Sequence, residues 1–217
     1  TSKVPSLDNS NHKIGDWIRA SVEKSISNLG RTFIDELLFH RVTDILNGDK
    51  LEIASTLSEL KTEGIIRKAG VSVYDFDNLH YLTEHFDIDV IQAPFNIFDR
   101  RLISSGLINT LAKKKIEIQV RSIFLQGALL SKKTPSKLKK YDKTFNYWQK
   151  WCIKKKLNKV KICLHFVKSF NKISSIIIGI NDIEQLKEII KFLKEKTIDT
   201  GYKNIIKNNN IIDPRKW

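Results

Sequence analysis

Short apolar stretches alternate with longer amphipathic stretches along almost the whole chain, and this alternation limits the folds that the chain can adopt. Only a few residues connect each stretch to the next. Such an order favours a parallel β-sheet covered by helices. We predict six strands, at residues 1–3, 36–40, 65–72, 88–92, 116–122 and 174–179. We predict seven helices, at residues 13–30, 51–63, 76–85, 101–114, 138–155, 159–170 and 183–196.

Three aspartates are placed to begin helices. Asp49, Asp75 and Asp182 each precede a stretch of helical period, and an aspartate there can accept hydrogen bonds from first-turn N–H groups. No Gly-x-Gly-x-x-Gly sequence follows a predicted strand, which weighs against a Rossmann domain. A barrel of eight strand–helix units usually needs about 250 residues. We therefore expect an α/β fold of the (β/α)8 TIM-barrel type, with residues 1–217 forming a single domain whose first two strand–helix units lie ahead of Thr1.

The composition suits one domain with a substantial core, since 41% of the 217 residues are hydrophobic. The longest apolar run, at residues 173–179, is too short to cross a bilayer, and no signal peptide opens the chain. Cys152 and Cys163 match no metal-binding spacing. These observations predict a cytoplasmic protein with free thiols, no bound metal and no membrane partner.

The formal net charge of +14 raises the question of an anionic partner. A nucleic-acid surface is one explanation. Lysine supplies 30 of the 38 basic residues, and these lysines are spread over several predicted helices. Nucleic-acid recognition tends to use arginine for bidentate contacts. We therefore favour solvated helix faces and expect no nucleic-acid partner; steeply salt-dependent retention on DNA would indicate the opposite.

Each predicted strand ends in a polar residue or, at Gly179, in a glycine. In a (β/α) barrel, chemistry takes place where the strands end, whereas apolar side chains fill the strands themselves. A single histidine at a strand end is more often structural, but six such ends in order are hard to explain by packing alone. The residues at these ends are Lys3, His40, Ser72, Gln92, Arg121 with Ser122, and Gly179.

Several motifs in the same order resemble the aldo-keto reductase family from its third strand to its C-terminus. They are TSKVP at 1–5, LLFHR at 37–41, GIIRKAGVS at 64–72, VIQAPFNIFDR at 90–100, RSIFLQG at 121–127 and IIIG at 176–179, followed by Gln185. The resemblance implies reduction of a small-molecule carbonyl compound, with NADP(H) or NAD(H) as cofactor.

The family uses four catalytic residues, an Asp, a Tyr, a Lys and a His. The resemblance assigns the lysine to Lys3 and the histidine to His40, and it places the Asp and the Tyr ahead of Thr1. Val73 stands where many members carry Asn, and Arg121 where many carry an aromatic residue that stacks on the nicotinamide. The residues that the resemblance assigns to the cofactor are Ser72, Gln92, Arg121, Ser122, Phe124, Gln126, Gly127, Gly179, Asn181 and Gln185.

Two functions remain compatible with these residues. One is an oxidoreductase acting on an aldehyde, a ketone or a sugar-like carbonyl, and the other is a barrel that binds the cofactor but serves as a regulatory or scaffold subunit. Members that require NADPH commonly carry a Lys-Ser pair and an Arg after the last strand, where this chain has GINDIEQ at 179–185. We therefore predict use of both cofactors. The sequence leaves the substrate and the oligomeric state open.

Overall fold

The computed structural model describes residues 1–6, 13–203, 206 and 208–217. Its strands form one six-stranded sheet in the order β1-β2-β3-β4-β5-β6, and the pairs with an assigned register are parallel. The α/β fold class and the six strands are therefore confirmed. The strands are β1 (Ser2–Val4), β2 (Ile34–Phe39), β3 (Ile66–Ser72), β4 (Val90–Pro94), β5 (Glu117–Arg121) and β6 (Ser175–Ile176).

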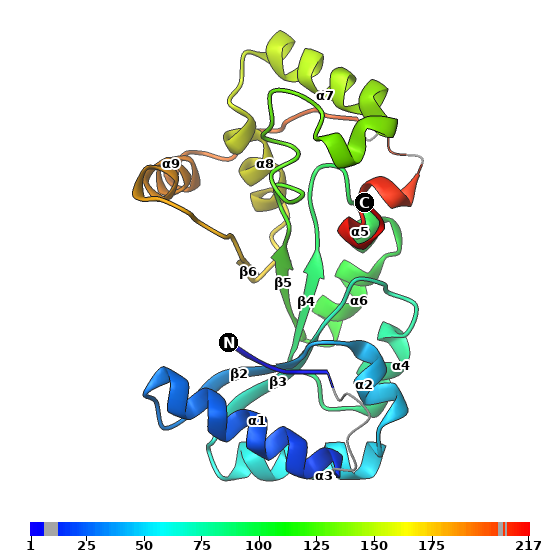
Figure 1. Ribbon diagram of the computed structural model, residues 1–217, viewed down its shortest axis with the longest axis vertical. Helices are drawn as coiled ribbons and strands as arrows, with labels where there is room; N and C mark the ends of the chain where they lie inside the picture. Colours follow the sequence, from blue (N-terminus) through cyan, green and yellow to red (C-terminus); the bar gives the residue numbers. More distant parts are fainter. Residues whose placement is uncertain (7–12, 204–205, 207) are drawn as a thin grey trace. The chain divides into compact units, whose positions relative to one another are not determined.

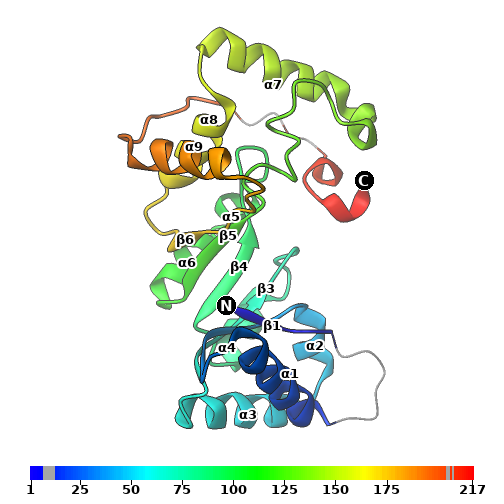
Figure 2. The same cartoon turned by 60° about the vertical axis from the view of Figure 1, so that its left-hand side comes forward.

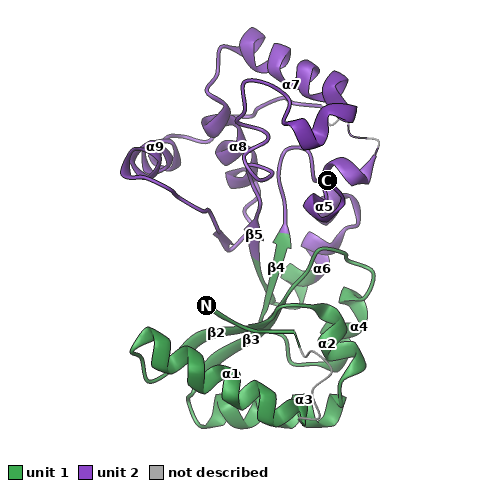
Figure 3. Cartoon of the chain, in the orientation of Figure 1, with its two compact units in different colours: residues 1–93, 111–118 green, residues 94–110, 119–217 purple. Residues whose placement is uncertain are grey.

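The chain divides into two compact units, which are coloured separately in Figure 3. Unit 1 comprises residues 1–93 and 111–118, and unit 2 comprises residues 94–110 and 119–217. The helices before the division are α1 (Ile14–Leu29), α2 (Val42–Asn47), α3 (Lys50–Thr62) and α4 (Leu79–His85). The later helices are α5 (Arg101–Ser104), α6 (Leu107–Lys113), α7 (Asp142–Lys155), α8 (Lys159–Lys168) and α9 (Ile183–Lys194), with 3-10 helices at Ser136–Tyr141, Asn209–Ile211 and Pro214–Lys216.

In unit 1, α1 and α3 lie side by side along the strands β1 to β3 (Figure 1). The helical period of α1 places Ile18 and Val22 on its buried face. Its polar face carries Arg19, which forms ion pairs with Glu59 and Glu63 at the end of α3. Apolar burial supplies most of the stabilisation here, because exposed ion pairs of this kind contribute little.

Gly70 allows the central strands of unit 1 to approach closely. A Cβ atom at this position would lie 2.2 Å from the carbonyl oxygen of Val90 and 2.7 Å from Cδ2 of Leu38. Glycine is therefore required where β3 passes between β2 and β4. Ser72, two residues later on the same strand, depends on this packing for its position.

In unit 2, an aromatic cluster and a buried histidine hold the helices in place. Trp148 on α7 is fully buried, packs edge-on against Phe98, and donates its indole N–H to the carbonyl oxygen of Leu129 at 2.9 Å. His165 is also fully buried: its Nδ1 accepts the N–H of Ile198 at 3.1 Å, so Nε2 donates to the carbonyl oxygen of Phe192 at 3.0 Å. These bonds fix the end of α9 beside α8, as Figure 2 shows.

Helix caps account for several of the boundaries. Asp49 accepts the N–H groups of Leu51 and Glu52, and Asp182 accepts that of Gln185, so both predicted caps are confirmed. The predicted cap at Asp75 is wrong. The helix begins at Leu79, after a turn in which the Leu79 N–H donates to the carbonyl oxygen of Phe76. Aspartate and asparagine favour turns over helix, and three of them lie at residues 75–78.

Two other helices that were predicted to be continuous are interrupted or begin later in the structure. The helix expected at 101–114 is divided into α5 and α6 at Gly106, whose φ of +75° belongs to the left-handed region. The helix expected at 138–155 begins as the 3-10 turn Ser136–Tyr141 and becomes α-helical only at Asp142. The short helix α2 was not predicted, because six residues are too few to show a helical period.

The remaining boundaries agree more closely. The predicted strand 88–92 is shifted to Val90–Pro94, and the predicted strand 174–179 forms a strand only at Ser175–Ile176.

Cys152 and Cys163 are free and buried in α7 and α8. Among the helices that the structure describes, none has the length and apolar character needed to cross a membrane.

Candidate active site

In unit 1, Lys3 contacts two of the residues that the resemblance assigns to the cofactor, Ser72 and Gln92. Its Nζ atom donates to Oγ of Ser72 at 3.2 Å and to Oε1 of Gln92 at 2.8 Å. Ser72 and Gln92 are buried polar residues, with exposed fractions of 5% and 4%. A partly buried ammonium thus lies directly beside a hydroxyl and an amide, which together offer hydrogen-bond donors and acceptors to a polar ligand.

The strand register relates His40 to the same group. Ser72 is paired with Gln92, and Phe39 is paired with Val71. His40 comes directly after Phe39, just as Ser72 comes directly after Val71, so His40 lies level with Ser72 and Gln92 along the strands. The ladder continues to His40, whose N–H donates to the carbonyl oxygen of Val4 at 3.2 Å. Lys3 is paired with Leu38, two residues before His40. Because side chains alternate between the faces of a strand, Lys3, His40, Ser72 and Gln92 share one face. The imidazole of His40 is exposed.

In unit 2, a cavity of about 590 Å³ brings together eight of the ten residues predicted to bind the cofactor. Its volume is typical of sites that bind small molecules and cofactors. The residues come from the end of β5, the loop after it, the loop after β6 and the first turns of α9. The predicted residues in this lining are Arg121, Ser122, Phe124, Gln126, Gly127, Gly179, Asn181 and Gln185.

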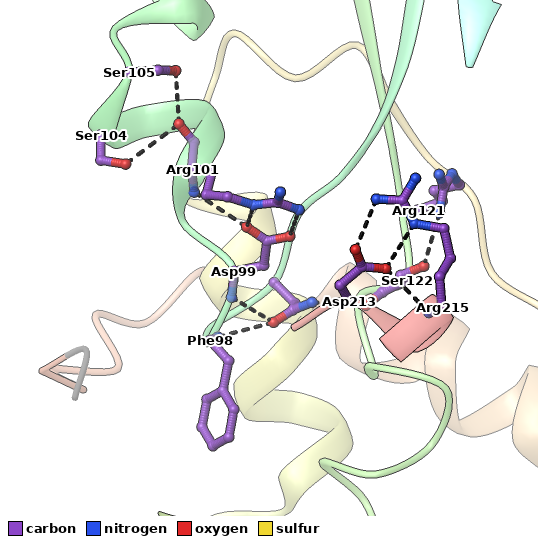
Figure 4. A network of polar contacts seen from close by, with 10 residues as sticks. Phe98, Asp99, Arg101, Ser104, Ser105, Arg121, Ser122, Asp213 and Arg215 are labelled. Atoms are coloured by element: carbon purple, nitrogen blue, oxygen red, sulfur yellow. Dashed lines mark hydrogen bonds and ion pairs between the residues drawn. The ribbon is translucent and has the colours of Figure 1, made fainter. Parts of the chain in front are cut away.

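The loop after β5, residues 122–127, has an unusual backbone. Ser122, Leu125, Gln126 and Gly127 all have positive φ angles, of 59°, 50°, 52° and 80°. Left-handed backbone costs a non-glycine residue about 1–2 kcal/mol, and such strained segments tend to occur at ligand sites. Figure 4 shows Arg121 beside Ser122, and Nη1 of Arg121 donates to Oγ of Ser122 at 3.3 Å.

Several backbone N–H groups of this loop are available to a ligand. Those of Ile123, Phe124, Gln126 and Gly127 donate no hydrogen bond within the part of the chain that the structure describes. Converging backbone N–H groups with left-handed residues among them are typical of anion-binding loops. The loop is therefore chemically suited to bind an anion such as a phosphate group, and its assignment to the cofactor stays a prediction.

The N-terminus of α9 forms the other side of this cavity. The side chain of Asp182 accepts the N–H of Gln185 at 2.8 Å, and Oε1 of Gln185 accepts the N–H of Asn181 at 3.1 Å. Lys187, the nearest lysine on this helix, forms an ion pair with Glu184. The helix dipole favours an anion here, whereas the carboxylates of Asp182 and Glu184 disfavour one.

Two polar residues of unit 2 were missed by the sequence predictions. Glu188 lines the cavity, and its Oε1 accepts a hydrogen bond from Nδ2 of Asn158 at 2.9 Å. Its position three residues after Gln185 on a predicted helix is the signal that would have found it. Asn96 donates from Nδ2 to the carbonyl oxygen of Ser122 at 3.0 Å. Asn96 lies within the motif at 90–100, but its contact spans 26 residues and no local pattern predicts that contact.

The strands of the parallel sheet follow one another in chain order without a reversal, as in a (β/α)8 barrel and unlike a doubly wound sheet, so the fold is that of part of a (β/α)8 barrel. Comparison with known proteins identifies it further. The Aldo/keto reductase family model matches residues 1–208. The chain therefore belongs to the aldo/keto reductase family, and the resemblance seen in its motifs is confirmed.

Individual relatives are more distant. The chain is 32% identical over 113 residues to an NADH-specific methylglyoxal reductase of Escherichia coli, covering 52% of this chain and 34% of that protein. It is 29% identical over 124 residues to a D-arabinose 1-dehydrogenase of Saccharomyces cerevisiae, covering 53% and 37%. The alignments thus span little more than a third of these curated relatives.

A solved structure supports the fold. The holo form of the aldo-keto reductase AKR11C1 from Bacillus halodurans superimposes with a TM-score of 0.72 at 19% identity, covering 91% of this chain and 66% of that one.

Proposed function

We propose that the protein is an NAD(P)H-dependent oxidoreductase that reduces an aldehyde, a ketone or a sugar-like carbonyl. The observation that carries this proposal is the contact of Lys3 with Ser72 and Gln92, on the sheet face that also carries His40. Membership of the aldo/keto reductase family supports the reaction class. The names of the relatives, a methylglyoxal reductase and an arabinose dehydrogenase, support a small carbonyl substrate.

The chemistry explains the residue types at the strand ends. A bound reduced nicotinamide would be the source of hydride for the carbonyl carbon, and negative charge would then develop on the carbonyl oxygen. His40, as a neutral imidazole, would donate a hydrogen bond to that oxygen and orient it. The proton donor of the family is a tyrosine that the resemblance places ahead of Thr1, and a nearby ammonium such as that of Lys3 would lower the pKa of its phenol.

The polar residues around Lys3 would hold the reacting end of the cofactor. Gln92 offers both a donor and an acceptor to a carboxamide, and Ser72 offers a hydroxyl. In unit 2, the backbone N–H groups of the loop 122–127 would bind the pyrophosphate, while Gly179, Asn181 and Gln185 would contact the adenosine. Among the described residues beyond its two chain neighbours, none has an atom within 4 Å of the position that a Cβ atom would take at Gly179, which leaves room for a ligand.

The charge around the start of α9 suits either cofactor. A 2′-phosphate favours nearby arginine or lysine, and here Lys187 is paired with Glu184 while Asp182 adds a further carboxylate. The positive end of the helix dipole and the amide of Asn181 act in the opposite direction. We therefore propose use of both NADPH and NADH.

Replacement of His40 tests the proposed function. His40→Ala in the full-length protein should lower turnover by about 10²–10³, because a donor to the developing oxyanion is lost. Cofactor affinity should stay within about twofold, since His40 is assigned to the substrate oxygen. The measurements are NADPH oxidation with a panel of carbonyl compounds and cofactor titration by fluorescence.

His80→Ala provides the matched control, because His80 is an exposed histidine on α4. It should leave both quantities unchanged. Unaltered turnover in His40→Ala would remove the catalytic role of His40. Tight cofactor binding without reduction of any carbonyl by the wild-type protein would favour the regulatory or scaffold function instead.

A further inference from the structure

Asn96 uses its whole side chain to join the end of β4 to the loop that follows β5. Oδ1 accepts the N–H groups of Phe98 and Asp99, both at 2.9 Å, and Nδ2 donates to the carbonyl oxygen of Ser122 at 3.0 Å. The two N–H donors require the side-chain oxygen of Asn96 on one side, and the carbonyl oxygen of Ser122 requires its side-chain nitrogen on the other. These contacts therefore determine the orientation of the Asn96 amide. The residue is 1% exposed, which makes each of these bonds costly to lose.

The turn that carries Asn96 is itself rigid. The backbone N–H of Asn96 donates to the carbonyl oxygen of Asp99 at 3.1 Å. The buried carboxylate of Asp99 accepts two hydrogen bonds from the guanidinium of Arg101, at 2.9 and 2.8 Å, as Figure 4 shows. One residue earlier, the N–H of Phe95 donates to the carbonyl oxygen of Arg121 at 3.1 Å. Asn96 therefore approaches Ser122 from a fixed support.

The bond from Asn96 controls the peptide that begins the loop 122–127. The carbonyl oxygen of Ser122 accepts both Nδ2 of Asn96 and the N–H of Leu125, the latter at 2.8 Å. Because a trans peptide is planar, the N–H of Ile123 points opposite to this carbonyl. Ile123 is 2% exposed and lines the cavity, yet its N–H has no acceptor among the described residues. A buried N–H without a protein acceptor is rare in native proteins, so this group is available to bind a ligand in the cavity.

We infer that Asn96 is a positioning residue for the cofactor: it holds Ser122 in its left-handed conformation and turns the N–H groups of the loop 122–127 towards the pyrophosphate. This inference rests on the proposed function. Asn96 contacts no part of the cofactor. It acts through Ser122, whose φ of +59° would otherwise relax towards the ordinary right-handed or extended region.

Asn96→Asp separates the two ends of the side chain. Aspartate keeps an oxygen for the N–H groups of Phe98 and Asp99, but it replaces the Nδ2 donor by an oxygen that faces the Ser122 carbonyl. We expect the dissociation constants for NADPH and NADH to rise about ten- to hundredfold, because a buried acceptor loses its donor and meets a like charge. Asn96→Ser, whose shorter side chain withdraws the donor from the Ser122 carbonyl without adding charge, should raise them about tenfold. It replaces the aspartate variant if that one does not fold.

Two further readouts distinguish positioning from general damage to the fold. Adenosine carries no phosphate, so its affinity, measured by ligand-observed NMR, should change by less than about twofold in either variant. Without ligand, the amide of Leu125 should exchange with deuterium about tenfold faster or more, because its acceptor is no longer held. Asn146→Asp is the matched control, since Asn146 is exposed on α7 and its side-chain amide donates to Asp142 of the same helix. All three quantities should remain at wild-type values.

The outcomes separate this inference from the proposed function. If the wild-type protein binds the dinucleotides and both Asn96 variants bind them equally well, the positioning role is wrong and the proposed function stands. Equal weakening of dinucleotide and adenosine binding would also overturn the positioning role, because the damage would not be confined to the loop. If the wild-type protein binds neither dinucleotide, both proposals fail.

Discussion

Adding a single methyl group at Gly70 should destabilise the sheet strongly. In Gly70→Ala the new Cβ atom would lie 2.2 Å from the carbonyl oxygen of Val90, which is short of ordinary van der Waals contact by roughly 1 Å. The obstacle is backbone, so no change of rotamer can relieve it. Strands β3 and β4 must separate along the pairs that Gly70, Val71 and Ser72 form.

The size of the effect follows from that separation. Overpacking of a core typically costs about 1–3 kcal/mol, and weakening two backbone hydrogen bonds adds about 1 kcal/mol each. We expect a loss of about 3–5 kcal/mol, which is a large part of the 5–15 kcal/mol that is typical of a whole domain. Urea unfolding followed by circular dichroism measures this loss. Cofactor affinity should fall as well, because Ser72 and Gln92 lie at the displaced end of the same strand pair.

Gly30→Ala is the appropriate comparison. Gly30 has a φ of +58° at the end of α1. Apart from Gly30 and its two chain neighbours, no described residue has an atom within 4 Å of the position that a Cβ atom would take there. This substitution should cost only about 1 kcal/mol, through backbone conformation alone. If Gly70→Ala is no more destabilising than Gly30→Ala, the close approach of β3 and β4 is not a constraint on the fold, and the reasoning from it is refuted.

Three further predictions concern the cofactor, a thiol and an ion pair. Titration of both cofactors by fluorescence should show that NADPH binds less than about a hundredfold more tightly than NADH, a difference in binding free energy of under about 3 kcal/mol. A preference for NADPH of several thousandfold would show that other residues bind the 2′-phosphate. Burial raises the pKa of the Cys152 thiol to about 12. Alkylation of Cys152 at pH 8 should therefore be about a thousandfold slower in the folded protein than in the protein unfolded by urea. Equal rates would disprove its burial. The hydrogen bonds from Arg215 hold the pKa of Asp213 below its usual value. Their stabilisation is therefore complete above about pH 4 and is lost as the pH falls through the lowered pKa. Asp213→Asn should cost about 1–2 kcal/mol at pH 7 and less at pH 3, and a pH-independent cost would contradict this.

The sequence by itself determined the order of the elements, because that order depends on local patterns. Apolar runs and helical periods predicted six parallel strands, and the side chains of Asp49 and Asp182 cap helices as expected. Asp75 does not, because the residues after it prefer a turn and neighbouring structure decides where a helix begins. Gly106 likewise divides a predicted helix, since a single glycine inside a helical pattern only weakly indicates a break.

The candidate site was predictable where each residue lies at the end of a strand or in a family motif. Lys3, Ser72 and Gln92 were named from such positions, and the tertiary structure shows that Lys3 donates hydrogen bonds to both Ser72 and Gln92. The roles of all these residues towards substrate and cofactor stay predictions. Asn96 lies in the motif at 90–100, but its role could not be predicted from that motif, because it depends on one hydrogen bond to Ser122 across 26 residues. The periodic spacing of hydrophobic residues and the position of a strand end can both be read from residues that are neighbours in the sequence. The hydrogen bond between the buried amide of Asn96 and the distant carbonyl of Ser122 forms only when the strands have assembled.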